Sequence, residues 1–345
     1  EDMSRASGQP AAPSAIIGAG AWGTALAIHL ARRGGRARLW ARDPALAAEM
    51  RETGQNARYL PGLAIPPGVE VISEPATALA GTGTVIVAVP SEFVRAVVGT
   101  LAHAVPPGAI IVSAAKGLEP ERGGRISCLL SELLPGHPVA VLSGPSFARE
   151  VALGLPTALV VASEDGEVAR LVQQALTAPA FRLYTSRDVI GVEIAGALKN
   201  VVAIAAGLSD SLHLGENARA ALVTRGLAEI VRLGVALGAS ARTFLGLAGV
   251  GDLVLTATGS LSRNRALGLA VGQGRSLAEA EGATRTVAEG ARTVDSALRV
   301  AAAASVSMPI CEAVASVLHG GTPAAQALAA LLARPLQPED EGGDG

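Results

Sequence analysis

The stretch Ala15-Ile16-Ile17-Gly18-Ala19-Gly20-Ala21-Trp22-Gly23 decides how the first half of the chain folds. Its leading apolar residues are typical of a short buried strand, and Ala25 to Arg33 beyond it is typical of a helix that ends at Gly34-Gly35. In such a turn the first glycine allows a sharp bend, the second lets the backbone approach a pyrophosphate, and the third lets helix and strand pack closely. The pyrophosphate would lie at the helix N-terminus, where free N–H groups and the helix dipole favour an anion.

We therefore expect Gly18, Gly20 and Gly23 to hold a dinucleotide. The motif alone does not name the cofactor, because FAD and S-adenosylmethionine proteins share such turns, and a glycine-rich turn also occurs without a ligand. The next apolar run, Arg36 to Trp40, is expected to be a second strand and is followed by Arg42 and Asp43. A guanidinium at position 42 can bind a 2′-phosphate or lie over the adenine, so we expect NADPH to be used at least as well as NADH. Asp43 leaves NAD open, and the alternative for Arg42 is a solvated surface position.

Further apolar runs, separated by helix-compatible stretches, predict a Rossmann-type doubly wound parallel sheet covered on both faces. These runs are Thr84 to Val89, Ala109 to Ser113, Val139 to Leu142 and Thr157 to Ala162, with helices expected over Ser91 to Leu101 and Arg125 to Leu134. From Asp188 onward no strand is expected, and helices are expected over Val189 to Leu208, Asn217 to Leu237, Arg263 to Val271, Val287 to Ala304 and Pro309 to Leu318. The chain thus divides into a dinucleotide-binding domain (14–188) and an all-α substrate domain (189–335), with disordered ends at 1–13 and 336–345.

Composition excludes several classes of function. The chain has 345 residues, enough for two domains, and its 28 basic and 30 acidic residues give a net charge of −2, which argues against nucleic acid as a partner. Cys128, Cys311 and the five scattered histidines lack metal-binding spacing, so we expect neither a metal nor a disulfide. No signal peptide and no apolar run of transmembrane length is present in the sequence, which predicts a cytoplasmic enzyme without a membrane span.

A lysine in an apolar helix is the first candidate for catalysis. Between Ile194 and Leu208 the only polar side chains are Lys199 and Asn200. A lysine buried in such a helix loses several kcal/mol of hydration unless it is paired or lines a wet cavity, as a catalytic lysine does. Alternatively, Lys199 extends along its own stem to solvent.

Other polar groups are expected at the carboxyl edge of the sheet and in the helical half. Lys116 follows one strand, and Ser143-Gly144-Pro145-Ser146 follows the next, at the edge where doubly wound sheets bind ligands. Asp252 lies in a glycine turn, from which it could pair with a buried lysine. Ser262-Arg263-Asn264 opens a helix with a good N-cap and suits a phosphate. The alternatives are ordinary connections and an ordinary capped helix with surface arginines.

These motifs together resemble the bacterial-type NAD(P)-dependent glycerol-3-phosphate dehydrogenases. The matching stretches follow the family's order from about residue 15 to 318. They are Gly18-Ala19-Gly20-Ala21-Trp22-Gly23-Thr24-Ala25, Lys116-Gly117-Leu118-Glu119, Ser143-Gly144-Pro145-Ser146-Phe147-Ala148, Gly196-Ala197-Leu198-Lys199-Asn200, Thr224-Arg225-Gly226, Gly249-Val250-Gly251-Asp252-Leu253, Ser262-Arg263-Asn264 and Val287-Ala288-Glu289-Gly290. The residue before Trp22 is often serine in the family and is alanine here, where its backbone N–H would still serve.

The resemblance implies reversible reduction of dihydroxyacetone phosphate to sn-glycerol 3-phosphate with NADP(H) or NAD(H), toward glycerophospholipid synthesis. It implies that Lys199 exchanges the proton at the substrate oxygen, and the chemistry agrees if Asp252 holds Lys199 while Lys116 and Asn200 add polarisation. The implied substrate-binding residues are Lys116, Gly144, Ser146, Lys199, Asp252, Ser262, Arg263 and Asn264. The implied dinucleotide contacts, besides the glycines, are Ala21, Trp22, Arg42, Lys116, Ala148, Arg263, Val287 and Glu289.

Two other classes of protein stay open from the sequence. One is a related reductase of the ketopantoate or hydroxyacid type, against which the phosphate site around Arg263 argues, because those substrates carry no phosphate. The other is a non-enzymatic dinucleotide sensor, against which the joint presence of Lys199, Asp252 and Arg263 argues. The apolar faces of the helical half suggest a homodimer.

Overall fold

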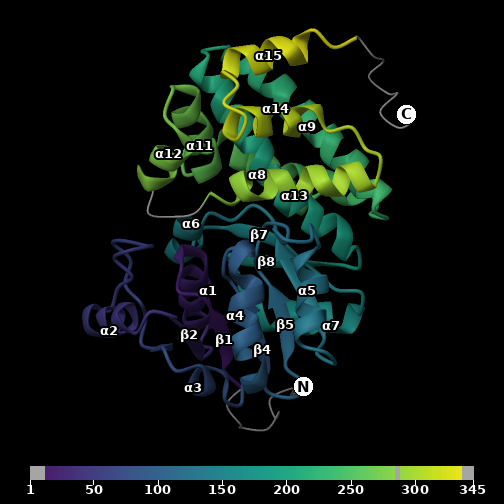
Figure 1. The fold of residues 1–345 in the computed structure, drawn as a ribbon. Helices are drawn as coiled ribbons and strands as arrows, with labels where there is room; N and C mark the ends of the chain where they lie inside the picture. The colour runs from purple at the N-terminus through teal and green to yellow at the C-terminus, as the bar shows by residue number, and fades with distance from the viewer. Residues whose placement is uncertain (1–11, 284–287, 336–345) are drawn as a thin grey trace.

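An eight-stranded sheet occupies one half of the computed structural model, which describes residues 12–283 and 288–335 (Figure 1). The strand order is β3-β2-β1-β4-β5-β6-β7-β8, as in a doubly wound fold. The strands are β1 (Ser14–Ile17), β2 (Ala37–Trp40), β3 (Val69–Ile72), β4 (Thr84–Val87), β5 (Ile110–Ser113), β6 (Val139–Ser143), β7 (Thr157–Ala162) and β8 (Phe181–Ser186). Strands β3 and β8 were not expected. Both are edge strands in which apolar and polar residues alternate, so neither has the continuous apolar run of a buried strand.

The doubly wound sheet is confirmed, but the expected parallel pairing is wrong for one pair of strands. Strands β6 and β7 pair antiparallel, whereas the other neighbours are parallel. Residues 144–156 connect the two strands and include the six-residue helix α6 (Ala148–Leu153). The chain reverses direction through this segment instead of crossing back to the start of β6.

Helices cover both faces of the sheet, as expected. Consecutive residues of β1 enter different cores, because Ile16 packs on one face while Ala15 and Ile17 pack on the other. The helices of this half are α1 (Ala21–Arg32), α2 (Pro44–Thr53), α3 (Pro75–Leu79), α4 (Val94–Leu101), α5 (Ile126–Leu133), α6 and α7 (Gly166–Leu176), with 3-10 turns η1 (Ser91–Phe93) and η2 (Ala102–Ala104). Helix α1 begins at Ala21 and not at Ala25 as expected, because Gly20 is its N-cap and the glycine turn runs straight into the helix.

No described residue after Ser186 forms a strand, in agreement with the expected helical half. Its helices are α8 (Val189–Ser211), α9 (Gly215–Ala236), α10 (Asp252–Thr258), α11 (Arg263–Gly272), α12 (Leu277–Ala283), α13 (Glu289–Ala303), α14 (Pro309–Leu318) and α15 (Ala324–Leu332), with η3 (Ala241–Leu245) and a π turn η4 (Leu247–Gly251) before α10. Residues 1–11 of the N-terminal extension, the acidic tail 336–345 and Val287 lie outside the described residues, so the expectations made for them stay untested.

Helix α8 is the centre of the helical half. It is the one described helix that is long and apolar enough to cross a membrane, but 94% of its apolar window is buried among the other helices, as in a core helix. Helix α11 crosses it at very short range, because a Cβ added at Gly268 would lie 2.1 Å from the Ile204 carbonyl oxygen. This close crossing brings the start of α11 toward the middle of α8.

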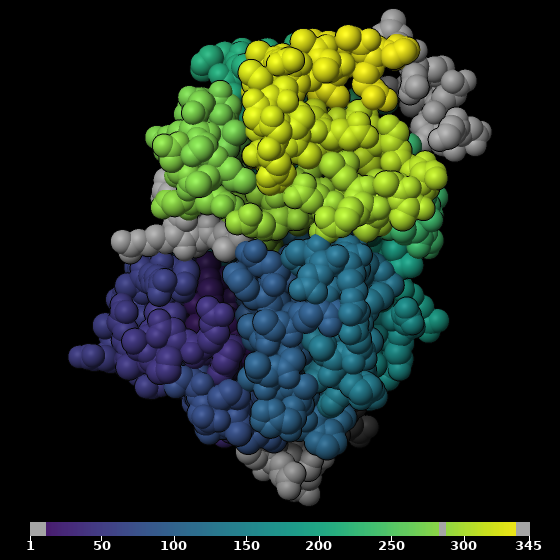
Figure 2. Space-filling view, in the orientation of Figure 1, coloured from purple at the N-terminus to yellow at the C-terminus, as the bar shows by residue number. Residues whose placement is uncertain are grey.

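The two halves meet along a broad seam (Figure 2). The Ser91 N–H donates to the Glu289 carboxylate across it at 3.2 Å, and Arg292 pairs with Glu92 at 3.6 Å. The segment after β4 therefore packs against the start of α13, and β6 packs against α8.

Candidate functional site

The glycine turn after β1 forms a cradle that side chains would fill. Gly18 has a φ of +113°, and a Cβ there would lie 2.8 Å from the Ala88 carbonyl oxygen. A Cβ at Gly23 would lie 1.9 Å from the Gly18 carbonyl oxygen. Gly20 faces open space and gives no side-chain cap to α1, so the first N–H groups of α1 are available. This arrangement fits the pyrophosphate of a dinucleotide.

Two neighbouring side chains agree with a ligand at this cradle. The buried indole nitrogen of Trp22 has no hydrogen-bond partner among the described residues, which is unusual for a buried donor. Arg42 is exposed just beyond the end of β2. Asp43, in contrast, is the N-cap of α2, and its carboxylate accepts from the Ala45 N–H at 2.9 Å. The carboxylate that could have bound ribose hydroxyls is therefore partly engaged elsewhere.

The structure brings Lys116, Lys199 and Asp252 together, although they are far apart in the sequence. Lys199 Nζ lies 2.5 Å from Asp252 Oδ1, and Lys116 Nζ lies 2.9 Å from Asp252 Oδ2. Lys199 and Asp252 are buried, at 5% and 0% exposure, while Lys116 is partly exposed. Two amino groups thus share one carboxylate at the seam.

Burial changes the chemistry of Lys199. Loss of hydration lowers its pKa from 10.5 to about 7, with the neighbouring positive charge of Lys116 adding to the decrease and Asp252 opposing it. An amine with a pKa near neutrality both donates and accepts a proton readily at physiological pH. Sequence reasoning missed Thr256, whose hydroxyl is 2.8 Å from Lys199 Nζ. Its spacing of four residues after Asp252, on one face of α10, was the available signal.

Lys116 also contacts the turn that follows β6. Its Nζ donates to the Gly144 carbonyl oxygen at 2.7 Å and lies 3.3 Å from Ser146 Oγ. Ala148 is the first residue of α6, which starts in this turn. The Lys116 ammonium group therefore links the residue that follows β5 to the turn that follows β6.

Asn200 and Asn264 form a chain of amide hydrogen bonds across the helices. Asn200 Nδ2 donates to the Lys116 carbonyl oxygen at 2.9 Å, and Asn264 Nδ2 donates to Asn200 Oδ1 at 2.9 Å. Asn264 Oδ1 in turn accepts from the Gly290 N–H at 3.0 Å. These bonds hold α8, α11 and α13 against the loop that carries Lys116.

The N-terminus of α11 lies close to this network. Ser262 is its N-cap, as expected, with Oγ accepting from the Arg265 N–H at 3.2 Å. The N–H groups of Arg263 and Asn264 have no acceptor within the helix, so they are free to bind an anion. The Arg263 side chain is exposed, and its positive charge partly offsets the rise in the Glu289 pKa that burial causes.

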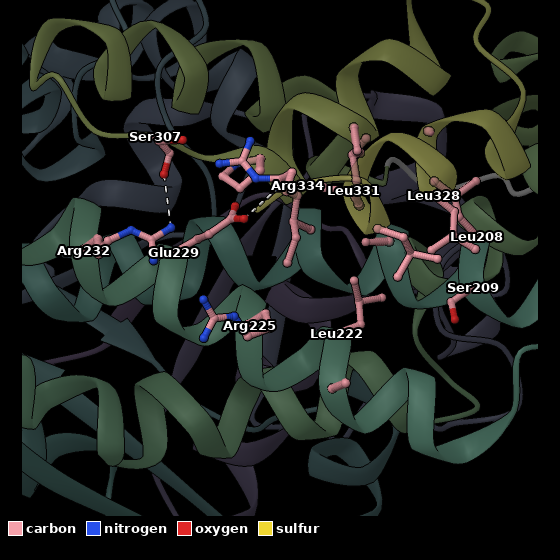
Figure 3. Close-up of a pocket in the computed structure, with 18 of the residues that line it drawn as sticks. Leu208, Ser209, Leu222, Arg225, Glu229, Arg232, Ser307, Leu328, Leu331 and Arg334 are labelled. Carbon is pink, nitrogen blue, oxygen red and sulfur yellow. Dashed lines mark hydrogen bonds between the residues drawn. The ribbon is translucent and has the colours of Figure 1, made fainter. Parts of the chain in front are cut away.

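A large cavity lies elsewhere, among α8, α9, α14 and α15 (Figure 3). Its volume is about 1370 Å³, and leucines such as Leu222 and Leu328 line it together with Arg232 and Glu229. None of the expected site residues lines it. Glu229 accepts from the Ile310 N–H at 2.7 Å, which is a structural contact at the start of α14. Among the described residues, no group of three His, Cys, Asp or Glu side chains could hold a metal ion.

Comparison with known proteins identifies the family. Residues 13–169 match the N-terminal part, and residues 188–329 the C-terminal part, of the NAD-dependent glycerol-3-phosphate dehydrogenases. The chain belongs to this family. Membership makes it an NAD(P)-dependent oxidoreductase with a Rossmann-type fold, as the sequence predicted.

Relatives of this dehydrogenase family are similar over almost their full length. The glycerol-3-phosphate dehydrogenase [NAD(P)+] of Geobacter sp. (strain M21) is 50% identical over 94% of this chain and 98% of its own. The glycerol-3-phosphate dehydrogenase [NAD(P)+] of Moorella thermoacetica is 49% identical over 96% of this chain and 98% of its own. The crystal structure of the Coxiella burnetii glycerol-3-phosphate dehydrogenase has a TM-score of 0.91 at 40% identity, covering 94% of this chain and all of the other. A ketopantoate reductase from Ralstonia eutropha shares only the fold, at 18% identity and a TM-score of 0.60.

Proposed function

We propose that this protein is an sn-glycerol-3-phosphate dehydrogenase that reversibly reduces dihydroxyacetone phosphate to sn-glycerol 3-phosphate with NADPH or NADH. The observation that carries the proposal is the cluster of Lys199, Asp252 and Lys116, in which Lys199 and Asp252 are buried, together with the N-terminus of α11 that Asn264 and Asn200 link to Lys116. It joins a proton donor, a positive charge and an anion site at one seam. The expected division into a dinucleotide-binding half and a helical half near residue 188 supports a site at that seam.

Lys199 supplies the proton in this proposal. When bound, the reduced nicotinamide supplies a hydride to C2 of the ketone. The negative charge that develops on the C2 oxygen is stabilised by the Lys199 ammonium, which then transfers its proton to that oxygen. Asp252 and Thr256 hold Nζ in place, at 2.5 Å and 2.8 Å, and the pKa near 7 lets Lys199 act in both directions.

Lys116 and the helix N-terminus position the substrate. The Lys116 ammonium, held by Gly144 and Asp252, adds positive charge beside the reacting oxygen. The free N–H groups at the start of α11 and the exposed Arg263 side chain bind the phosphate. The binding energy of the phosphate then orients the carbonyl group at the other end of a three-carbon substrate.

At the other end of the seam, the first turn of α1 receives the pyrophosphate, and Ala21, Trp22 and Arg42 surround the rest of the dinucleotide. Val287, Glu289 and Ala148 complete the proposed dinucleotide contacts. We further propose a cytoplasmic homodimer in which the reduction feeds glycerophospholipid synthesis.

A spectrophotometric assay tests this function. Oxidation of NADPH and NADH is followed at 340 nm with dihydroxyacetone phosphate, ketopantoate and pyruvate as alternative substrates. We expect turnover with dihydroxyacetone phosphate alone, because only that substrate presents a phosphate to α11. Equal turnover of ketopantoate would point to the related reductases instead. Dinucleotide binding without turnover of any ketone would point to a sensor.

A further inference from the structure

A buried asparagine fixes the segment between α2 and β3 against the glycine turn. Asn56 is fully buried, and its Nδ2 donates to the Ala19 carbonyl oxygen at 2.9 Å and to Thr24 Oγ1 at 2.8 Å. Its Oδ1 accepts from the Tyr59 N–H at 3.1 Å. A buried amide with three such partners holds its surroundings in one geometry. The residues next to Asn56 are therefore placed relative to the dinucleotide cradle.

This segment brings a second arginine to the end of β2. Arg58 Nη1 lies 3.8 Å from Asp43 Oδ2, and the guanidinium lies over the Tyr59 ring at 5.2 Å from its centroid. Asp43 directly follows the exposed Arg42, so Arg58 contacts the residue next to Arg42, three positions beyond the end of β2. The other carboxylate oxygen of Asp43 accepts from the Ala45 N–H and is held by the start of α2.

The pairing of Arg58 with Asp43 is easily exchanged. Both side chains are about half exposed, at 52% and 49%, and their separation of 3.8 Å is at the limit of an ion pair. Such exposed pairs contribute little to stability. A phosphate monoester carries up to two negative charges and accepts paired hydrogen bonds from a guanidinium, so it competes well with a single carboxylate.

We infer that Arg58 is a second cofactor-specificity residue, which binds the adenosine 2′-phosphate of NADPH together with Arg42. Arg58 also neutralises Asp43, whose carboxylate would otherwise repel that phosphate. With NADH, which lacks the phosphate, Arg58 stays paired with Asp43, and the glycine turn after β1 contacts the ribose hydroxyls. This inference rests on the proposed function, since it concerns the same dinucleotide.

Binding measurements without substrate test the inference. Dissociation constants for NADPH and NADH are measured by titration calorimetry on the wild type and on Arg58→Gln. We expect Arg58→Gln to weaken NADPH binding about tenfold or more, because a charged hydrogen bond is lost, and to change NADH binding less than threefold. Arg58→Lys, which keeps the charge without the planar fork, should give an intermediate loss.

Two further variants separate the causes. Arg182→Gln, on the opposite edge strand β8, also removes an exposed arginine and should leave both dissociation constants unchanged. Asp43→Asn keeps an N-cap residue and removes the charge. If Arg58→Gln still weakens NADPH binding in the Asp43→Asn background, Arg58 binds the phosphate directly.

Three results would overturn the inference. They are equal effects of Arg58→Gln on NADPH and NADH, no effect on either, or a loss that vanishes in the Asp43→Asn background. Failure of the wild type to bind either dinucleotide would instead refute the proposed function. The two failures are therefore distinguishable.

Discussion

Replacing Lys199 by methionine is the sharpest test of the proposed chemistry. Methionine has a similar length but carries neither charge nor proton, so it removes the proposed donor with little change in packed volume. The variant should fold, because Asp252 keeps Lys116 at 2.9 Å and is not left as an unpaired buried charge.

The expected loss follows from what Lys199 does. A positioned general acid contributes typically 10² to 10⁴ in rate, and a charge aimed at a developing oxyanion about 10² to 10³. One group performs both tasks, so the two factors overlap, and kcat should fall about 10³-fold or more, or about 4 kcal/mol in the barrier. The assay is NADPH oxidation with saturating dihydroxyacetone phosphate, with NADPH binding measured separately as the control for folding. A kcat within tenfold of the wild type would refute the assignment.

The pH dependence gives an independent check on Lys199. Because burial lowers its pKa to about 7, the side chain is protonated below that pH and neutral above it. Reduction needs the protonated form, so its rate should fall as pH rises through about 7, while oxidation of glycerol 3-phosphate should rise over the same range. The residual activity of Lys199→Met should lack both of these pH-dependent changes in rate. If both changes persist in the variant, another group causes them.

Three other substitutions probe separate parts of the molecule. Arg263→Ala should raise KM for dihydroxyacetone phosphate about tenfold or more with a smaller effect on kcat, and an unchanged KM would move the phosphate elsewhere. Gly23→Ala should abolish NADPH binding in a titration, because its Cβ would lie 1.9 Å from the Gly18 carbonyl oxygen, and wild-type affinity would contradict the cradle. Glu229, which accepts from the Ile310 N–H, has its pKa raised by burial from 4.5 to about 7. The folded state therefore binds the extra proton between these values, and stability should fall as pH rises from about 4.5 to 7. Glu229→Gln should remove this fall in urea unfolding, whereas an unchanged pH profile would show that another group causes it.

Local patterns were enough for much of the fold. The glycine turn, the alternation of strands and helices, and the change to helices after residue 188 each depend on neighbours in sequence, through strand and helix periodicity. Helix α14 was expected over Pro309 to Leu318 and has those bounds, because proline begins it and an apolar face continues to its end. Ser262 was recognised as an N-cap for the same reason, since its partner is three residues away.

Errors arose where distance in space matters more than local composition. The antiparallel pairing of β6 and β7 depends on the direction that the chain takes through residues 144–156, which the composition of that segment does not reveal. The edge strands β3 and β8 depend on the neighbours that supply their hydrogen bonds, so their short alternating sequences were not distinctive. The role of Asp43 as a helix cap could not be separated from a ribose contact without the start of α2.

The sequence by itself made Lys199 a candidate for catalysis, because a lysine in an apolar helix loses hydration unless it is paired, lines a wet cavity or extends to solvent. It also predicted a dinucleotide-binding turn and a capped helix at Ser262. Only the tertiary structure decided what Lys199 is paired with. Asp252 is 53 residues from Lys199 and 136 from Lys116, yet its two carboxylate oxygens contact both amines. Packing of α10 against α8, and of α8 against β6 and β7, brings these charges together, and burial then lowers the Lys199 pKa toward neutrality.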